Sequence, residues 1–224
     1  MNKLLLSTAL AVGTLVAAGS ASASTLSLQY DGPVNGFQTV SVTGPGFSKN
    51  ALAGAYKMKD MTTNKSLVVL CMDILAYVSS NTVYPYKMTN TPFSNSPGLS
   101  GGAVAKLQAL FDSSYSAALT STAKSAGFQV AAWNLIYDGD LSVDTGSFQQ
   151  NGSSASKTAA NAFLAAAGSY GGGKKYNLTF LESTKTPTRS QNLVTVAAVP
   201  IPAAGLMLIG ALGGLFAARR RRKA

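Results

Sequence analysis

The chain has 224 residues, of which 46% are hydrophobic and 12% are charged, and its formal net charge is +10. It contains no histidine and one cysteine, which excludes an internal disulfide, serine–histidine or cysteine–histidine catalysis, and any metal site built from histidine. Six of the 18 basic residues lie in the two terminal segments, so the rest of the chain contains 12 basic residues and all eight acidic ones. The basic character therefore gives no support to a nucleic-acid partner.

The N-terminus has the three parts of a secretory signal peptide. Lys3 supplies a short positive region, residues 4–18 are apolar, and Ala21-Ser22-Ala23 is a small-residue cleavage motif. We expect residues 1–23 to be a signal peptide that is cleaved after Ala23. The alternative is a retained N-terminal membrane helix, which the shortness of the apolar run disfavours.

The first third of the mature chain alternates apolar and polar residues as β-strands do. Strands are predicted at residues 25–30, 37–43 and 53–59, separated by turns rich in glycine, proline and asparagine. Residues 66–78 are almost continuously apolar, which predicts a central strand covered on both faces. Residues 81–102 contain prolines and paired glycines and are expected to form a loop.

The middle third is predicted to be helical. Apolar residues recur at helical spacing over residues 103–119 and 122–137, and an alanine-rich helix is expected over residues 157–167. Residues 174–182 alternate again as a strand, and residues 192–197 form a further candidate strand. This order predicts an α+β fold, in which an antiparallel β-sandwich or barrel-like core carries a helical insertion. The globular domain is expected over residues 24–183, followed by a spacer at residues 184–198.

Residues 199–224 combine a proline motif, an apolar run and a basic tail. Residues 203–218 carry no charge, and as a helix they would span about 24 Å, near the thickness of a bilayer core once arginine side chains snorkel. The positive-inside rule places the basic tail in the cytoplasm and the rest of the mature chain outside. The tail consists of Arg219, Arg220, Arg221, Arg222 and Lys223.

This layout resembles the sorting signal of the PEP-CTERM/exosortase class of exported bacterial proteins, in the variant whose tail begins V-P-L-P-A-A. The resemblance rests on Val199, Pro200, Pro202 and Ala203, while the literal Pro-Glu-Pro is absent. It implies recognition by an exosortase-like membrane transpeptidase, transient anchoring in the inner membrane with the body in the periplasm, and transfer to the cell surface or extracellular matrix. The alternative is an ordinary C-terminal membrane anchor.

Two short motifs carry a chemical pattern. One is Leu70-Cys71-Met72-Asp73 in the predicted central strand, and the other is the Phe-Gln-Val-Ala-Ala-Trp of residues 128–133 in the second predicted helix. The pair resembles the two motifs of bacterial thioester domains in surface adhesins. The resemblance implies an internal thioester with Cys71 as the sulfur donor and Gln129 as the acyl donor. Such a bond attaches the protein once to an amine-bearing partner, needs no cofactor or metal, and is not enzymatic turnover.

Two neighbours would complete the thioester site. Trp133 lies one helical turn after Gln129, where it would shield the bond from water. Asp73 shares a strand face with Cys71 by the period of two, and would orient nearby groups. The alternative from the residues alone is a buried free cysteine beside an ordinary core helix.

Weaker alternatives also stay open. Asp138, Asp140 and Asp144 suggest calcium, but Ser142 and Gln149 stand at two ligand positions of the calcium-loop pattern, so a polar loop is favoured. The tyrosines of the first third would line a glycan surface or, by preference, pack across strands. The predicted function is covalent attachment of an exported surface or matrix protein to an amine-bearing protein or surface polysaccharide. The alternatives are a non-covalent structural or glycan-binding matrix component and an envelope hydrolase, the latter without motif support.

Overall fold

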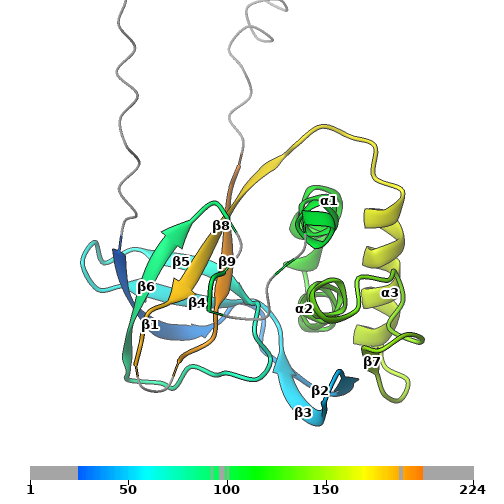
Figure 1. Ribbon diagram of the computed structural model, residues 1–224, viewed down its shortest axis with the longest axis horizontal. Coiled ribbons are helices and arrows are strands. Elements are labelled where there is room, and N and C mark those ends of the chain that lie inside the picture. Colours follow the sequence, from blue (N-terminus) through cyan, green and yellow to red (C-terminus); the bar gives the residue numbers. More distant parts are fainter. Residues whose placement is uncertain (1–24, 92, 96–98, 100, 187–188, 199–224) are drawn as a thin grey trace, which may run out of the picture.

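The computed structural model describes residues 25–91, 93–95, 99, 101–186 and 189–198. Six antiparallel strands close into a barrel in the order β1-β4-β5-β9-β8-β6 (Figure 1). Closure leaves none of these strands with a free edge, which a half-open sheet would expose. The barrel strands are β1 (Thr25–Pro33), β4 (Tyr56–Asp60), β5 (Ser66–Cys71), β6 (Val83–Thr89), β8 (Tyr176–Ser183) and β9 (Leu193–Ala198).

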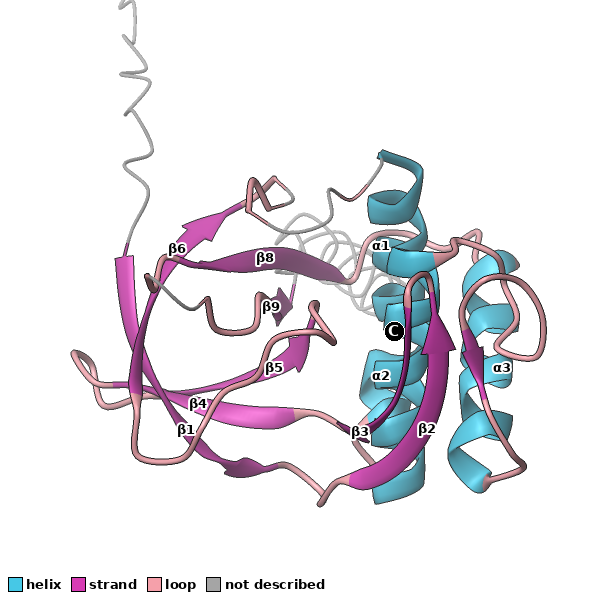
Figure 2. Ribbon diagram, turned by 60° about the horizontal axis from the view of Figure 1, so that its bottom comes forward, coloured by secondary structure: helices cyan, strands magenta, loops and turns pink. Residues whose placement is uncertain are grey.

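Three helices pack beside the barrel as one block (Figure 2). They are α1 (Gly101–Ala118), α2 (Thr122–Tyr137) and α3 (Ala155–Gly168), and all three lie between β6 and β8 in the sequence. The prediction of a barrel-like antiparallel core with a helical insertion is therefore confirmed. Serine residues begin two of the helices, since Ser121 Oγ accepts from the N–H of Lys124 and Ser154 Oγ from that of Lys157.

Helix α2 is buried on every side, and residues 125–135 are all buried. The apolar stripe predicted from the sequence therefore underestimates its burial. α3 passes so close that a Cβ added to Gly127 would lie 2.6 Å from the carbonyl oxygen of Ser156 and 2.7 Å from Cβ of Ala159. Glycine is required at this position by the contact between the two helices.

A small second sheet has the order β3-β2-β7 and lies against α2. Its strands are β2 (Gln38–Gly44), β3 (Phe47–Ala53) and β7 (Gln149–Gln150). β2 and β3 form a hairpin in which Gly44 pairs with Phe47 across the turn. The sequence predicted β2 but neither β3 nor β7.

Three further expectations are corrected. The predicted strand over residues 66–78 ends at Cys71, and residues 74–80 are not in a strand. β6 lies in the segment expected to be a loop. The predicted spacer at residues 184–198 contains β9, which pairs with both β5 and β8, so the globular domain extends to Ala198. β5 itself is central as predicted, since Val69, Leu70 and Cys71 are all buried.

The predicted signal peptide and sorting segment lie outside the described residues. This applies to Ala23, Val199, Pro200, Pro202, Ala203 and the four arginines Arg219–Arg222. Within the ranges that the structure describes, none of the helices has the length and apolarity needed to cross a membrane.

Candidate functional site

Cys71 and Gln129 are brought together from the end of β5 and the middle of α2. The backbone N–H of Cys71 donates to Oε1 of Gln129 at 2.9 Å, and Nε2 of Gln129 donates to the backbone oxygen of Cys71 at 2.7 Å. The two residues are 4% and 1% exposed. The Gln129 carboxamide is thus fixed in a buried position against the residue that carries the thiol.

The polar side chains of α2 explain this docking. The β4–β5 ladder ends where Tyr56 pairs with Val69, and Gln129 then supplies partners for Cys71 beyond the end of β4. One helical turn earlier, Oγ of Ser125 accepts from the N–H of Ala55 at 2.8 Å. Ser125 and Gln129 therefore satisfy backbone groups that the barrel leaves without strand partners, as buried polar groups require.

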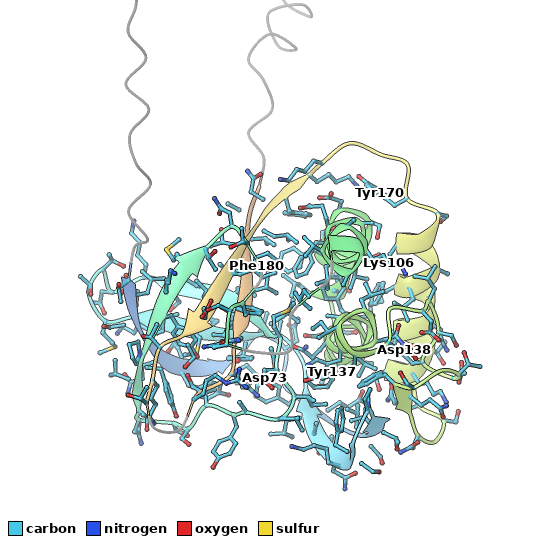
Figure 3. The ribbon with its side chains drawn as sticks, viewed as in Figure 1. Asp73, Lys106, Tyr137, Asp138, Tyr170 and Phe180 are labelled. Atoms are coloured by element: carbon cyan, nitrogen blue, oxygen red, sulfur yellow. The ribbon has the colours of Figure 1, made fainter. Side chains whose placement is uncertain are left out.

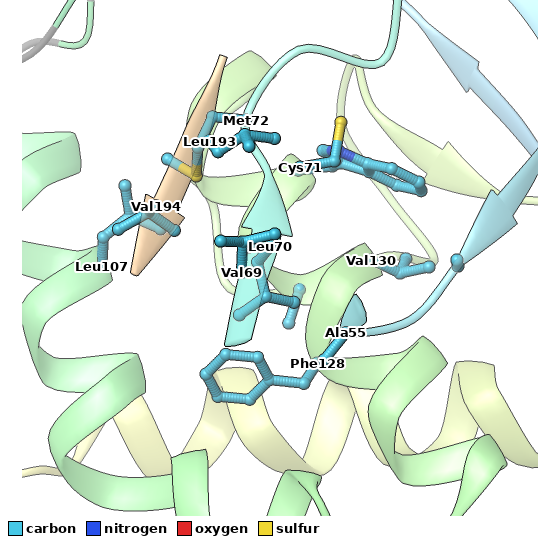
Figure 4. Close-up of a cluster of buried hydrophobic side chains, with 14 of the residues drawn as sticks. Ala55, Val69, Leu70, Cys71, Met72, Leu107, Phe128, Val130, Leu193 and Val194 are labelled. Atoms are coloured by element: carbon cyan, nitrogen blue, oxygen red, sulfur yellow. The ribbon is translucent and has the colours of Figure 1, made fainter. Parts of the chain in front are cut away.

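The sulfur of Cys71 is held by the turn that follows it. Sγ donates to the backbone oxygen of Asp73 at 3.2 Å and accepts from the backbone N–H of Asp73 at 3.4 Å. Burial raises the pKa of the Cys71 thiol to about 12, while Trp133 and Lys49 act in the opposite direction. Figure 4 shows the thiol among buried residues of β5 and its neighbours. The cysteine is therefore kept as a protonated thiol until a reaction removes its proton.

Asp73 lies in this turn rather than on a strand face with Cys71, because β5 has already ended. Its side chain is buried, its Oδ2 lies 2.6 Å from Nη2 of Arg189, and its Oδ1 accepts from the N–H of Leu75 at 3.1 Å. The hydroxyl of Tyr137, at the end of α2, accepts from the N–H of Ile74 at 3.3 Å. Figure 3 labels Tyr137 and Asp73 in this part of the molecule. These contacts fix the turn and with it the sulfur. Arg189 carried no motif that would have identified it from the sequence.

A pocket of about 400 Å³ opens beside Cys71 and Gln129. Cys71, Gln129 and Trp133 line it together, and its other walls come from three aromatic residues, strand β3 and the turn after β5. Trp133 is 1% exposed, and its indole Nε1 makes no hydrogen bond of regular geometry among the described residues, although the indole lies close enough to the Cys71 thiol to lower its pKa. The three aromatic residues are the half-buried or buried Tyr30, Phe37 and Tyr56, and a fourth, the exposed Tyr77 of the turn, also lines the pocket together with the exposed Leu52 of β3.

The acidic loop near the end of α2 uses its carboxylates internally. Oδ2 of Asp138 accepts from the N–H groups of Ser147 and Phe148, and Oδ1 of Asp140 accepts from Nδ2 of Asn134. Asp144 pairs with Lys157 at 2.6 Å. These bonds are those of a self-supporting polar loop. Across the described part of the chain, no three histidine, cysteine or acidic side chains are grouped as metal ligands.

No protein-family model matches the sequence, and no curated protein matches it. Among solved structures, the chain is similar to the N-terminal thioester domain of a surface protein from Clostridium perfringens, with 17% identity, coverage of 65% of this chain and 89% of that chain, and a TM-score of 0.43. A cysteine-to-alanine mutant of that domain gives 18% identity at the same coverage and a TM-score of 0.46. The N-terminal domain of the Streptococcus pyogenes pilus tip adhesin Cpa gives 15% identity, coverage of 73% and 96%, and a TM-score of 0.45. At these values the likeness adds no argument about chemistry.

Proposed function

We propose that this protein is exported and attaches covalently to amine-bearing partners through an internal thioester between Cys71 and Gln129. The observation that carries the proposal is the pair of hydrogen bonds that fixes the Gln129 carboxamide on the buried backbone of Cys71, beside an open pocket. Holding two reacting groups together in this way replaces an encounter in solution, and well-oriented pairs gain about 7 kcal/mol or more.

Thioester formation exchanges one leaving group. Sγ of Cys71 attacks Cδ of Gln129, the C–N bond breaks, and Nε2 leaves as ammonia with the proton of the thiol. The N–H of Cys71 already donates to Oε1, the atom on which negative charge develops. The indole N–H of Trp133 would supply a second donor in the same pocket, and its ring would shield the bond from water.

Attachment to a partner consumes the thioester. A lysine ε-amine of the partner attacks the thioester carbonyl, the C–S bond breaks, and the sulfur leaves with the amine proton to restore the Cys71 thiol. The product is an isopeptide bond between the partner and the former Gln129 side chain. Each molecule reacts once, so this is attachment rather than enzymatic turnover. The exposed Leu52 and Tyr77 mark the side from which a partner would enter.

The export route completes the proposal and is supported by the sequence pattern of the two chain ends. A signal peptide cleaved after Ala23 would deliver the body to the periplasm, and residues 203–218 would anchor it briefly in the inner membrane. An exosortase-like transpeptidase would then act near Val199-Pro200. The test compares the sizes of the membrane-bound and released forms: equal sizes would contradict processing of the tail.

A second candidate is a non-covalent glycan-binding or structural matrix component. It is favoured by Tyr77, which is 73% exposed at the pocket, and by the aromatic walls behind it. Aromatic faces of this kind stack on sugar rings. In this case the Cys71–Gln129 contact would serve only to dock α2 on the barrel.

The intact mass of the signal-cleaved protein separates the two candidates. A thioester lowers the mass by one ammonia and protects Cys71 from alkylation until methylamine is added. The Cys71→Ala variant, which lacks the sulfur, should have its full sequence mass. A full mass in the unaltered protein, with a thiol that reacts once the chain is unfolded, would leave the non-covalent candidate.

A further inference from the structure

Lys49 places an amine in the pocket of the reactive pair. It is the one charged side chain among the described residues that line this pocket, together with Cys71 and Gln129. Its Nζ donates to the backbone oxygen of Ile74 at 3.2 Å, so the side chain extends from β3 toward the turn that follows Cys71. Its partner is a neutral carbonyl rather than a carboxylate.

The charge of Lys49 also acts on the sulfur. The positive amine lowers the pKa of Cys71 against the larger effect of burial. This electrostatic effect agrees with the geometry, in which Lys49 and Cys71 line one pocket. The four-carbon stem of lysine is flexible, so Nζ can leave Ile74 and sample other positions in the pocket.

We propose that Lys49 is an internal competitor for the thioester, and that a thioester which meets no partner is captured by Lys49 as a Lys49–Gln129 isopeptide bond. This rests on the proposed function, because the thioester must form first. The uncharged Nζ of Lys49 attacks the thioester carbonyl carbon, the C–S bond breaks, and one amine proton ends on the sulfur of Cys71. Relative to the unreacted chain, the product has lost one ammonia and has regained a free thiol.

Proximity gives this reaction its advantage over a partner that is free in solution. An amine tethered in the same pocket reacts with an effective concentration that well-oriented systems raise to about 10⁵ M or more. A partner lysine prevails only if it is docked in the pocket before capture occurs. Only the uncharged amine is a nucleophile, so capture accelerates as the pH rises. Lys49 therefore limits the time during which the protein can attach.

The test follows freshly prepared signal-cleaved protein during incubation at pH 8.5, with three measurements on each sample. These are the intact mass, the number of thiols that react with a maleimide after unfolding in mild acid, and the change in mass after methylamine treatment. We expect the mass to stay one ammonia low while the thiol appears and methylamine sensitivity disappears. Digestion should then yield one branched peptide that joins Lys49 to Gln129.

Two variants provide the comparison. Lys49→Arg keeps the positive charge and removes the nucleophile, so it should stay sensitive to methylamine several-fold longer and should end as the hydrolysed product, in which one water has been gained. Lys65→Arg, in an exposed hairpin, should age as the unaltered protein does. Ageing by hydrolysis alone, equal in all three proteins, would overturn the capture while leaving the thioester in place. A full sequence mass in the fresh protein, without a branched peptide, would overturn both.

Discussion

Replacing Cys71 by alanine separates the covalent part of the site from its hydrogen bonds. The two bonds between residue 71 and Gln129 use only backbone atoms of residue 71, so Cys71→Ala retains both. The variant cannot form the proposed thioester, which would cross-link positions 58 residues apart. By the loop-entropy relation used for disulfides, losing a cross-link across a loop of that length lowers the free energy of unfolding by about 4 kcal/mol. Truncation of the buried cysteine side chain lowers it by about 1 kcal/mol more.

We therefore expect Cys71→Ala to lower the free energy of unfolding in urea by about 5 kcal/mol relative to the thioester form. Methylamine, which opens the thioester without removing the side chain, should remove the cross-link portion alone. Gln129→Ala should be the least stable protein, because it also leaves the buried N–H and C=O of Cys71 without partners, at a further cost of about 2 kcal/mol or more. A urea midpoint that methylamine does not move, with Cys71→Ala within about 1 kcal/mol of the unaltered protein, would refute the cross-link.

Three further changes probe the surroundings of the site. Arg189→Ala leaves the buried Asp73 carboxylate without its ion pair, so it should lower the free energy of unfolding in urea by about 3 kcal/mol and slow thioester formation. An unchanged urea midpoint would show that the ion pair does not hold the turn. Gly127→Ala forces α2 away from α3 and should lower the unfolding free energy by about 1–3 kcal/mol, whereas Gly171→Ala, with open space around it, should not. In the unreacted fold, burial raises the pKa of the Cys71 thiol to about 12, above the value of about 8.5 for unfolded cysteine, and opening the proposed thioester with methylamine would restore this buried thiol. The stability of the methylamine-opened protein should be full below about pH 8.5 and fall as the pH rises toward 12, and Cys71→Ala should lack this fall when urea midpoints at pH 8 and 9.5 are compared.

The helices could be predicted from the sequence because the spacing of apolar residues and the capping residues lie within one short segment. Residues 122–137 were predicted as a helix and form α2, which begins after the capping Ser121. The burial of α2 on every side over residues 125–135 could not be predicted, since it depends on the barrel on one side and α3 on the other. The buried polar residues Ser125 and Gln129 became understandable only when Ala55 and Cys71 were found beside them.

Of the three strands that were missed, β3, β6 and the two-residue β7, the first two were missed for opposite reasons. β6 contains Pro85, and a proline makes a segment a poor candidate for a strand because it has no N–H to donate. The carbonyl of Pro85 still accepts from the N–H of Thr184, so β6 pairs with both β1 and β8. β3 lacks the apolar alternation of a strand, and it forms because a two-residue turn sets it against β2.

The contact between Cys71 and Gln129 was predictable from the two motifs, and Trp133 lies beside them as expected. Two other residues near the site, Arg189 and Lys49, were not predictable. Arg189 and Lys49 reach the site from distant segments, and neither has a spacing that relates it to Cys71. Arg189 meets the side chain of Asp73, and Lys49 meets a backbone oxygen of Ile74. Contacts of this kind between distant segments produce no regular spacing in a sequence, so they can be identified only in the folded structure.

The pairing of β5 with β9 has a mechanical consequence. Cys71 lies opposite Leu193 at one end of β9, while Ala198, at the other end of β9, leads into the C-terminal segment. A pull on that segment, resisted at Cys71, would load β9 lengthwise between its two neighbouring strands. Such a load shears many ladder bonds together rather than breaking them one by one, so a force applied at the C-terminal end of β9 would meet the highest resistance that strand pairing with β5 offers.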